Sequence, residues 1–319
     1  PVSTSRGSGT TPAMATTAMT YTPAGDVETV DGPLSGTADT VTYIYNDAGN
    51  DMRQMIGVIG PDPDGGGSLL NRAQRLTYNS RGQVTLAETG TASGGTWSNF
   101  STILKSSTTY DTAQFFRPVE TRQLSAANAV SGVQQVTYDA AGRPSCVAVR
   151  MNPAEFSGLP SSACTLGTTG GFGPDRIVQT TYDDVGRPLT TTSALGTADA
   201  LTESVAYTDN GQVESLTDGQ GNVSIKEYDG FDRLANLRYP NATGGGTSTT
   251  DYEQYAFDDY GRLSTSRSRA GQTTSYTWDL LGRLRIIDAP SGTDDIEYRY
   301  DLLGRKTSVS TDVEILPIV

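Results

Sequence analysis

The sequence contains no histidine, the side chain that most often serves as a general base and as a transition-metal ligand. Phenylalanine and methionine are scarce, with seven and five residues, whereas glycine, threonine and serine are abundant. This composition favours sheets and turns over packed helices. No apolar run approaches the ~18–20 residues that a membrane-spanning helix needs, so membrane insertion is not expected.

Basic residues are also in short supply, with 23 Lys and Arg against 36 Asp and Glu and a net charge of −13. Nucleic-acid binding is therefore not expected, because phosphate recognition needs a basic surface. Among so many carboxylates, pairs at the separation used by glycosidases will occur by chance, and no pattern marks one pair. The sequence thus predicts no enzyme activity, catalytic residue, cofactor or metal ligand.

What the sequence does contain is one short motif repeated along most of its length: an aromatic residue, usually Asp, two variable residues, Gly and often Arg. The copies begin at Tyr21, Tyr45, Tyr78, Tyr138, Tyr182, Tyr207, Tyr228, Phe257, Trp278 and Tyr300, with a degenerate copy at Tyr110. The spacing is 21 to 29 residues from Tyr207 onward and reaches 44 residues upstream, where additional residues interrupt the repeat.

The residues after the aromatic predict a tight turn. Asp at the first position and Gly at the fourth match a type I turn, and Gly supplies the left-handed conformation of a G1 bulge. Asp232 replaces Gly in "YDGFDRL", and Asp is among the few residues that tolerate that conformation. Apolar and polar residues alternate on both sides, so each copy predicts a β-hairpin. Further turns are predicted between hairpins at 217–224, 268–275 and 289–296.

The side chains of the motif are interpreted as structural. We expect the Arg after each turn to lie across from the aromatic before it, and to stack on that ring or pair with nearby carboxylates. Because an isolated hairpin is marginal in water, the hairpins are expected to pair into one long sheet. The structural residues assigned in this way are Tyr138, Asp139, Gly142, Arg143, Tyr182, Asp183, Gly186, Arg187, Trp278, Asp279, Gly282, Arg283, Tyr300, Asp301, Gly304 and Arg305.

The pattern "Y-D-x-x-G-R-L", with "DGxGN"-type turns between its copies, resembles the RHS/YD-repeat family over most of residues 20–310. That family includes bacterial Rhs proteins, the C component of insecticidal toxin complexes and the barrel of animal teneurins. The resemblance implies an all-β fold, a YD-repeat β-solenoid whose repeated hairpins form a spiralling sheet or hollow shell. In the toxin members the shell encloses a C-terminal toxic polypeptide, and in teneurins it serves cell-surface adhesion.

The chain differs from the toxin members in the position and sequence of one segment. Their repeats end with a self-cleavage segment containing Asp-Pro-x-Gly-Leu, whereas the similar string "PDPDGGG" lies at residues 61–67, near the start of the array. We interpret it as a glycine-rich turn. Ca²⁺ binding by Asp62 and Asp64 is the alternative, although two acids make a poor site.

Changes in the spacing of the motif divide the sequence into segments. Residues 1–18 are expected to be a flexible lead or an edge segment, residues 19–312 the hairpin array, and residues 313–319 an apolar tail. Loop insertions are expected near 88–104 and 145–176, where Trp97, Phe100 and Phe156 could cover the shell or contact a partner. The start at Pro1 and the end in "EILPIV" are interpreted as those of a piece, or a processed form, of a longer protein.

The two cysteines, Cys146 and Cys164, bracket the irregular stretch "CVAVRMNPAEFSGLPSSAC". A disulfide between them is plausible in a secreted chain. Two unlinked thiols at strand ends are the alternative.

Two functional hypotheses remain. In the first, the chain is a non-catalytic scaffold, part of an RHS shell that encloses a polypeptide such as a toxin domain. In the second, it is an extracellular structural or adhesive protein whose units assemble end to end into fibres through exposed edge strands. Both place it outside a bacterial cell, secreted or at the surface, with the rest of a parent chain or neighbouring copies as partners. Carbohydrate binding is a further alternative.

Overall fold

The computed structural model describes residues 2–6, 15–34, 36, 38–46, 53–64, 67–114, 116–291 and 294–311. The chain divides into two units. The first contains Pro1–Val178 and Ala194–Ala198, and the second contains Gln179–Ser193 and Asp199–Val319. The predicted apolar tail at 313–319 lies outside the described residues.

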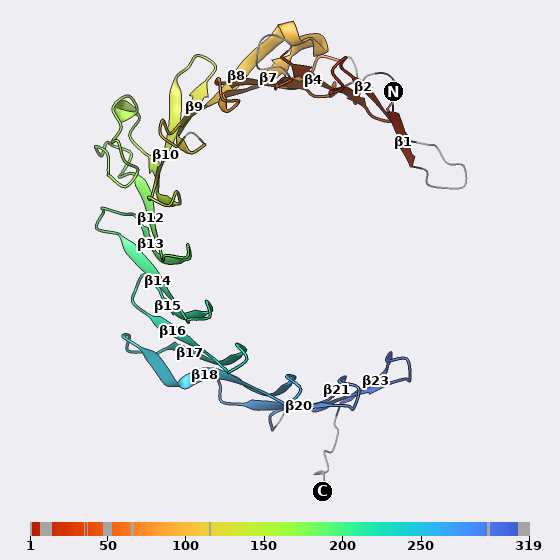
Figure 1. Ribbon diagram of the computed structural model, residues 1–319, viewed down its shortest axis with the longest axis vertical. Coiled ribbons are helices and arrows are strands. Elements are labelled where there is room, and N and C mark those ends of the chain that lie inside the picture. Colours follow the sequence, from red (N-terminus) through yellow and green to blue (C-terminus); the bar gives the residue numbers. More distant parts are fainter. Residues whose placement is uncertain are drawn as a thin grey trace. The chain divides into compact units, whose positions relative to one another are not determined.

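Regular structure in the described residues is almost entirely β-strand (Figure 1). The strands of the first unit are β1 (Val2–Arg6), β2 (Ala15–Tyr21), β3 (Val27–Asp31), β4 (Val41–Tyr45), β5 (Met55–Ile59), β6 (Asn71–Tyr78), β7 (Val84–Ala92), β8 (Phe100–Tyr110), β9 (Pro118–Ser125), β10 (Val130–Tyr138) and β11 (Pro144–Arg150). Strand β12 (Arg176–Tyr182) runs from the first unit into the second. The second unit continues with β13 (Pro188–Ser193), β14 (Leu201–Tyr207), β15 (Val213–Thr217), β16 (Val223–Tyr228), β17 (Leu234–Pro240), β18 (Thr247–Phe257), β19 (Leu263–Arg267), β20 (Thr273–Trp278), β21 (Leu284–Asp288), β22 (Ile296–Tyr300) and β23 (Lys306–Thr311).

The helices of the described residues are three short 3₁₀ turns, η2 (Ser93–Gly95), η3 (Trp97–Asn99) and η4 (Pro153–Glu155). The all-β prediction is confirmed. The period-two alternation and the recurring turns were sufficient to predict the fold class.

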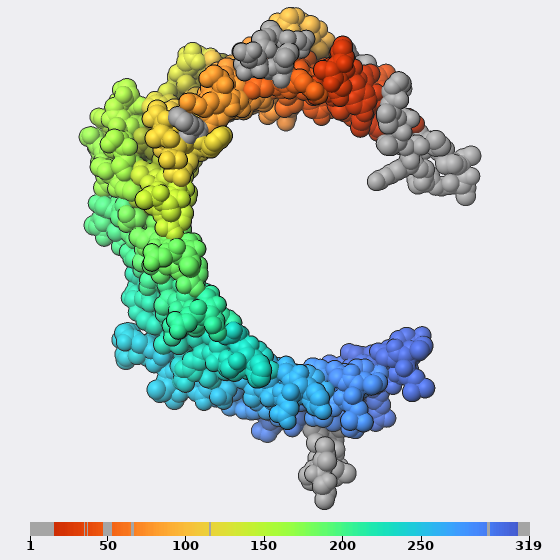
Figure 2. Space-filling model, in the orientation of Figure 1, coloured from red at the N-terminus to blue at the C-terminus, as the bar shows by residue number. Residues whose placement is uncertain are grey.

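Each strand pairs antiparallel with the next strand in the sequence, from β1 to β11 and again from β12 to β23. In the space-filling view, residues within each unit follow one another in sequence order (Figure 2). Each unit is therefore a single-layer sheet of hairpins, and most of its contacts join strands that follow one another in the sequence.

The hairpin turns shift the register at the aromatic residue. In the hairpin of β12 and β13, Thr181 lies opposite Thr190, whereas Tyr182 lies opposite Pro188. Gly186, within that turn, has a φ of 95°, and Asp232 takes the equivalent left-handed conformation with a φ of 60°. This geometry is a type I turn followed by a G1 bulge, and it increases the local twist of each hairpin.

Buried apolar side chains form two small clusters, both in the first unit. One consists of Ile59, Ala73 and Ala92, against which Trp97 and Phe100 pack. The other consists of Cys146, Ala148, Ala163 and Ile177. Among the described residues of the second unit no apolar side chain is fully buried, so its stability depends on half-buried rings and on the strand ladder.

The first insertion is shorter than the sequence suggests. Residues 88–104 were predicted to form a loop, but β7 continues to Ala92 and β8 begins at Phe100. Only residues 93–99 leave the sheet, because the flanking residues pair with each other as a lengthened hairpin. The second insertion occupies residues 151–175, between the end of β11 and the start of β12. At the other end of the unit, β1 pairs with β2 within the predicted lead segment.

The lengthened hairpin needs glycine at position 90. A Cβ atom on Gly90 would fall on the backbone carbonyl oxygen of Ser101 and lie 3.1 Å from the Cα of Thr102. We expect Gly90→Ala to cost about 2 kcal/mol of stability, the usual cost of overpacking, measured as a lower urea midpoint of the first unit. Gly132→Ala is the matched control, since its Cβ would meet only the Cβ of Gln123 at 4.0 Å. Equal midpoints for the two variants would show that the pairing of β7 with β8 is wrong.

Candidate functional site

The repeated motif is the candidate site, and its Asp is first of all part of its own turn. In the turn between β12 and β13, the Gly186 N–H donates to the Asp183 carbonyl over 3.1 Å. The Asp183 Oδ1 accepts from the backbone N–H groups of Val185 and Arg187, at 3.1 and 2.8 Å. The Arg187 Nε donates to Oδ2 over 2.6 Å. The Arg side chain thus pairs with the carboxylate that begins its own turn.

The same Asp–Arg pair recurs in the turns that begin at Asp139, Asp229, Asp258, Asp279 and Asp301. The pKa of each of these carboxyls is held below its ordinary value. For Asp258, the hydrogen bond from the Arg262 side chain is the main cause. At Asp183 burial raises the pKa, but hydrogen bonds from the side chain and backbone of Arg187 together lower it. Each carboxylate is therefore held ionised as an acceptor within a turn.

These lowered pKa values predict acid sensitivity of the second unit. A carboxyl whose pKa is lower in the folded state than in the unfolded chain, about 3.9 for Asp, stabilises the fold above that unfolded value. The stability is lost as the pH falls through the folded-state pKa. We therefore expect the urea midpoint to fall as the pH is lowered below about 4.

The control for this titration is the triple variant Asp183→Asn, Asp258→Asn and Asp279→Asn. Asn still accepts hydrogen bonds at the first turn position but has no proton to gain. Acid changes the charge of all other groups equally in both proteins. The variant should therefore lose less of its urea midpoint between pH 5 and pH 3 than the wild type, as about three titrating groups are removed. Parallel curves would contradict the assignment.

In most hairpins the aromatic residue of the motif donates a hydrogen bond to the hairpin before it. The Tyr207 hydroxyl donates to the Pro188 carbonyl over 2.9 Å, and the Tyr300 hydroxyl donates to the Leu284 carbonyl over 2.8 Å. Trp278 makes the same contact through its indole Nε1, which donates to the Leu263 carbonyl over 2.8 Å. Equivalent bonds are made by Tyr45, Tyr78, Tyr110, Tyr138 and Tyr228. In six of these eight bonds the acceptor is the sixth residue after the previous aromatic, and for Tyr78 and Tyr138 it is the tenth and the eighth.

The guanidinium groups connect the same neighbours. The Arg187 guanidinium lies 4.3 Å from the centre of the Tyr207 ring, and that of Arg283 lies 4.5 Å from the Tyr300 ring. Arg233 lies over Phe257 at 4.1 Å, and this ring has no hydroxyl. We expected each Arg to stack on the ring of its own hairpin or to pair with a nearby carboxylate: the carboxylate pairing is observed in these turns, whereas the ring is that of the next hairpin. The turn carries the guanidinium along the sheet to the next ring.

A comparison with protein-family models matches residues 257–294 to the RHS repeat. This stretch begins at Phe257, includes the turns at Asp258 and Asp279, and ends after β21. The resemblance based on the motif is thereby confirmed in this stretch.

Similar solved structures are long chains of toxin complexes. The TcdB2–TccC3 crystal structure is 16% identical, with a TM-score of 0.35, over 95% of this chain and 18% of that chain. The Tc holotoxin pore of Photorhabdus luminescens, which carries a mutant TccC3, is 14% identical with a TM-score of 0.35 over the same shares. A porin-like protein from Bacteroides uniformis is 11% identical, with a TM-score of 0.22, over 84% and 90% of the two chains. The chain thus spans about a fifth of the toxin-complex chains. The comparison with curated proteins found no match.

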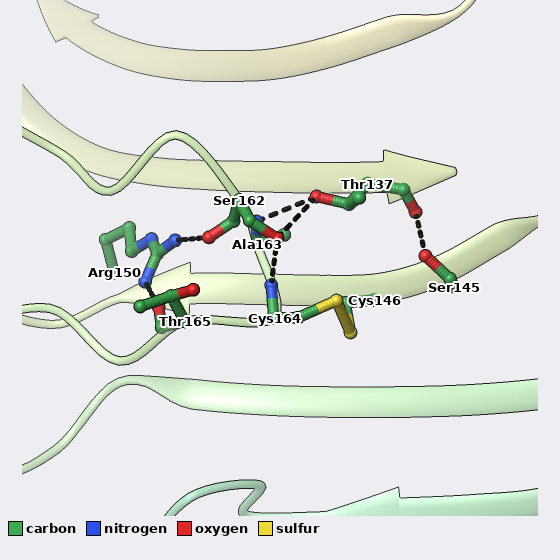
Figure 3. The surroundings of a disulfide bond; sticks show 8 residues. All are labelled: Thr137, Ser145, Cys146, Arg150, Ser162, Ala163, Cys164 and Thr165. Atoms are coloured by element: carbon green, nitrogen blue, oxygen red, sulfur yellow. Dashed lines mark hydrogen bonds between the residues drawn. A yellow bond between two sulfur atoms is a disulfide. The ribbon is translucent and has the colours of Figure 1, made fainter. Parts of the chain in front are cut away.

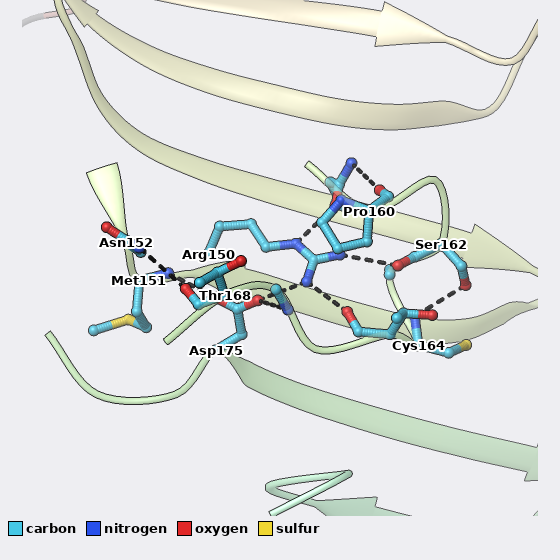
Figure 4. Close-up of polar contacts among 12 residues, drawn as sticks. Arg150, Met151, Asn152, Pro160, Ser162, Cys164, Thr168 and Asp175 are labelled. Atoms are coloured by element: carbon cyan, nitrogen blue, oxygen red, sulfur yellow. Dashed lines mark hydrogen bonds and ion pairs between the residues drawn. The ribbon is translucent and has the colours of Figure 1, made fainter. Parts of the chain in front are cut away.

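The second insertion of the hairpin array is organised around a buried ion pair (Figure 4). The side chains of Arg150 and Asp175 are 1% and 6% exposed, and Nη1 of Arg150 lies 2.7 Å from Oδ2 of Asp175. Arg150 also donates from Nε to the Gln135 side chain at 2.7 Å, and to the carbonyls of Thr165 and Ser162 at 2.7 and 2.9 Å. One guanidinium therefore connects strand β10, strand β11 and the insertion.

Asp175 is satisfied on both oxygens. Oδ1 accepts from the Met151 N–H over 2.9 Å, and Oδ2 accepts from the Gly167 N–H over 2.8 Å. Burial raises the pKa of this carboxyl, yet these backbone donors and Arg150 together lower it. The motif-based search missed this pair. Its only sequence signal is an Arg at the end of the apolar run "CVAVR".

The Sγ atoms of Cys146 and Cys164 form a disulfide that fixes the middle of the insertion to β11 (Figure 3). Their Cα atoms lie 5.2 Å apart, and the bond closes a separation of 18 residues. Beside it, the Ala163 N–H donates to the Thr137 hydroxyl over 2.8 Å. Phe156, within the same insertion, is buried. The insertion therefore covers the sheet.

Both insertions lie against the face of the sheet that is opposite the aromatic residues of the motif. In β10, Thr137 alternates with Tyr138, and the second insertion bonds to Thr137. Trp97 of the first insertion packs on the cluster that includes Ala73, and Ala73 lies on the face of β6 opposite Tyr78. The insertions thus cover the face that does not carry the motif rings.

The described residues contain no group of three or more Asp, Glu, Cys or His residues placed to hold a metal ion. Asp64 of "PDPDGGG" accepts the Leu69 N–H over 3.0 Å, while residues 65 and 66 lie outside the described part.

A cavity of about 620 Å³ lies between the turns at Asp111 and Asp139, with Ser161 of the insertion in its wall. Both carboxylates accept backbone N–H groups of their own turns. Within the described residues, no helix is long and apolar enough to span a membrane.

Proposed function

We propose that the chain is a non-catalytic scaffold, part of the wall of an RHS-type shell that encloses a polypeptide cargo. The observation that carries this proposal is the contact between successive hairpins. The ring of one motif copy and the Arg of the copy before it connect successive hairpins, as at Tyr207 and Arg187, while the Asp holds that Arg within its own turn. The motif side chains therefore serve to join repeated hairpins, which is what the wall of a shell requires.

Two further observations support the proposal. The RHS-repeat match places one full motif pair of the chain in a family whose repeats form shells. The disulfide between Cys146 and Cys164 supports a place outside the cytoplasm, secreted or at the cell surface, because disulfides persist in oxidising compartments.

Protease protection tests the scaffold. The chain would be expressed with the sequence that surrounds it in its reading frame, and the purified product would be treated with trypsin. We expect the polypeptide after the repeats to survive while the array is folded, and to be cut once urea unfolds the array. The same polypeptide expressed alone is the control. Equal cleavage with and without the folded array would contradict the proposal.

Assembly into fibres is the second candidate, and strand β23 favours it. All six residues of β23 are exposed, and among the described strands only β22 pairs with it. An open strand edge can recruit another strand. The test is electron microscopy of the concentrated protein and of Val309→Pro, because Pro removes a backbone donor. Fibres of the wild type that disappear in the variant would establish this function, and dispersed particles in both would dismiss it.

A further inference from the structure

The tips of the turns in the second unit carry large apolar side chains that face solvent. Figure 1 shows these turns as short hooks along one side of this unit. The residues at the tips, which together we name the tip ridge, are 75–106% exposed: Val185, Phe231, Tyr260, Leu280, Leu281, Leu302 and Leu303. A type I turn requires no apolar residue at its centre. The ring centres of Phe231 and Tyr260 lie 5.1 and 4.9 Å from the guanidinium groups of Arg233 and Arg262 in their own turns. Such ring stacking cannot explain the aliphatic Val185 and the four leucines.

The opposite edge of the same unit differs in composition. Its connections at residues 218–222, 241–246 and 268–272 contain Asp, Asn, Gln, Ser, Thr, Gly, Ala and one Arg. None of these segments contains Leu, Val, Ile, Met or an aromatic residue. The most exposed apolar residues of this unit are thus those of the tip edge, whereas Leu201 beside the 218–222 connection is 49% exposed. Contiguous exposed apolar residues mark interaction sites.

The spacing of the tips indicates the shape of the partner. Consecutive tips are separated by two paired strands, because each hairpin pairs with the next. At about 4.8 Å per strand, the tips recur about every 10 Å, which is the length of about three residues of an extended chain. A partner that contacts every tip would place an apolar side chain at about every third residue.

The charge of the tips indicates the partner's charge. The six turns at 183–187, 208–212, 229–233, 258–262, 279–283 and 301–305 contain nine Asp and five Arg residues. Each Arg is paired with the Asp of its own turn. Asp184, Asp209 and Asp259 are exposed at the tips themselves. The ridge is therefore both apolar and acidic, which suits a basic segment and disfavours a second copy of the same ridge.

We propose that the tip ridge binds an extended polypeptide segment with apolar residues at about every third position and basic residues between them. This inference rests on the proposed function, since it names the kind of cargo segment that the wall would contact. The leucine pairs at 280–281 and 302–303 are the main apolar contacts, and the exposed Asp residues supply the charge preference.

The test measures the binding of labelled peptides to the full chain by fluorescence anisotropy. The probe has five repeats of Leu-Lys-Ser, and the comparison peptides have five repeats of Leu-Glu-Ser or Ser-Lys-Ser. We expect the first peptide to bind at least about tenfold more tightly than either other, a difference of about 1.4 kcal/mol. Equal binding of the Leu-Glu-Ser peptide would overturn the basic preference, and equal binding of the Ser-Lys-Ser peptide the apolar one.

The matched variants locate the binding. Leu280→Ser with Leu281→Ser, Leu302→Ser and Leu303→Ser should weaken binding of the first peptide at least about tenfold without unfolding the sheet, because these side chains are exposed. Leu69→Ser with Leu70→Ser is the control, since these leucines are exposed in the first unit and away from any motif turn. Wild-type affinity in the ridge variant, with circular dichroism unchanged, would overturn the inference.

Two outcomes separate this inference from the proposed function. In the first, the cargo is protected from trypsin but the ridge variant binds the peptide as tightly as the wild type. This result would support the shell proposal and refute the binding role of the tip ridge. Peptide binding that depends on the ridge, together with a cargo that trypsin cuts freely, would support the ridge and refute the shell. Dimers that the ridge variant converts to monomers would assign the ridge to a second copy and overturn the inference.

Discussion

Asp175→Asn should destabilise the second insertion by about 3–5 kcal/mol, because it leaves the Arg150 guanidinium charged and buried without a counterion. Arg150 has no route to solvent, with 1% of its side chain exposed. The measurement is amide hydrogen exchange at Gly167, whose N–H donates to Asp175 in the wild type. Protection there should fall roughly 100- to 4,000-fold, as about 1.4 kcal/mol corresponds to a factor of ten.

Asp301→Asn is the matched control for the same substitution. Its partner Arg305 is 75% exposed, and exposed ion pairs contribute little. A third protein, Arg150→Met with Asp175→Asn, removes both charges and should recover part of the loss. Equal exchange in the Asp175→Asn variant and the wild type would show that the pair does not hold the insertion.

Removing the disulfide with Cys146→Ala and Cys164→Ala should cost the insertion about 3 kcal/mol, the chain-entropy value for a loop of about this length. The expected readout is faster cleavage of residues 151–175 by a protease, because the open form of the insertion becomes more populated. Alanine is chosen because Cys146 is buried beside Ala148 and Ile177, where a Ser hydroxyl would be costly.

The control for the disulfide is cleavage outside the insertion. With chymotrypsin, which can cut at Phe156 and Phe172 of the insertion, a site in the second unit such as the exposed Phe231 should be cut at the wild-type rate. Faster cleavage throughout the chain would mean that the disulfide stabilises more than the insertion. No change at residues 151–175 would mean that the Arg150 contacts hold the insertion without it.

The turns could be predicted from the sequence because their determinants are local. Asp183 and Gly186 lie within four residues of each other, and the left-handed glycine is required by the backbone itself. The same reasoning could not place Arg187 on Tyr207, since that contact depends on how one hairpin twists toward the next. Because sequence spacing carries no information on that twist, the expectation included the correct carboxylate partner but the wrong ring.

The insertions show the other limit. Gly, Ser and Thr in residues 88–104 hide the alternation of two strands, and these residues were taken for a loop although most of them pair. Arg150 and Asp175 are 25 residues apart, and neither lies in a motif. A buried charge pair of this kind is visible only once the chain is folded, because each partner alone is an ordinary charged residue.

The central claim is that each motif Arg acts on the next hairpin, and a double-mutant cycle tests it most directly. The cycle combines Arg283→Met with Tyr300→Leu, whose guanidinium and ring lie 4.5 Å apart. A second cycle combines Arg283→Met with Trp278→Leu, the ring of its own hairpin. We predict a coupling of about 0.5–1 kcal/mol in the first cycle and of less than about 0.3 kcal/mol in the second. Coupling to Trp278 without coupling to Tyr300 would contradict the account.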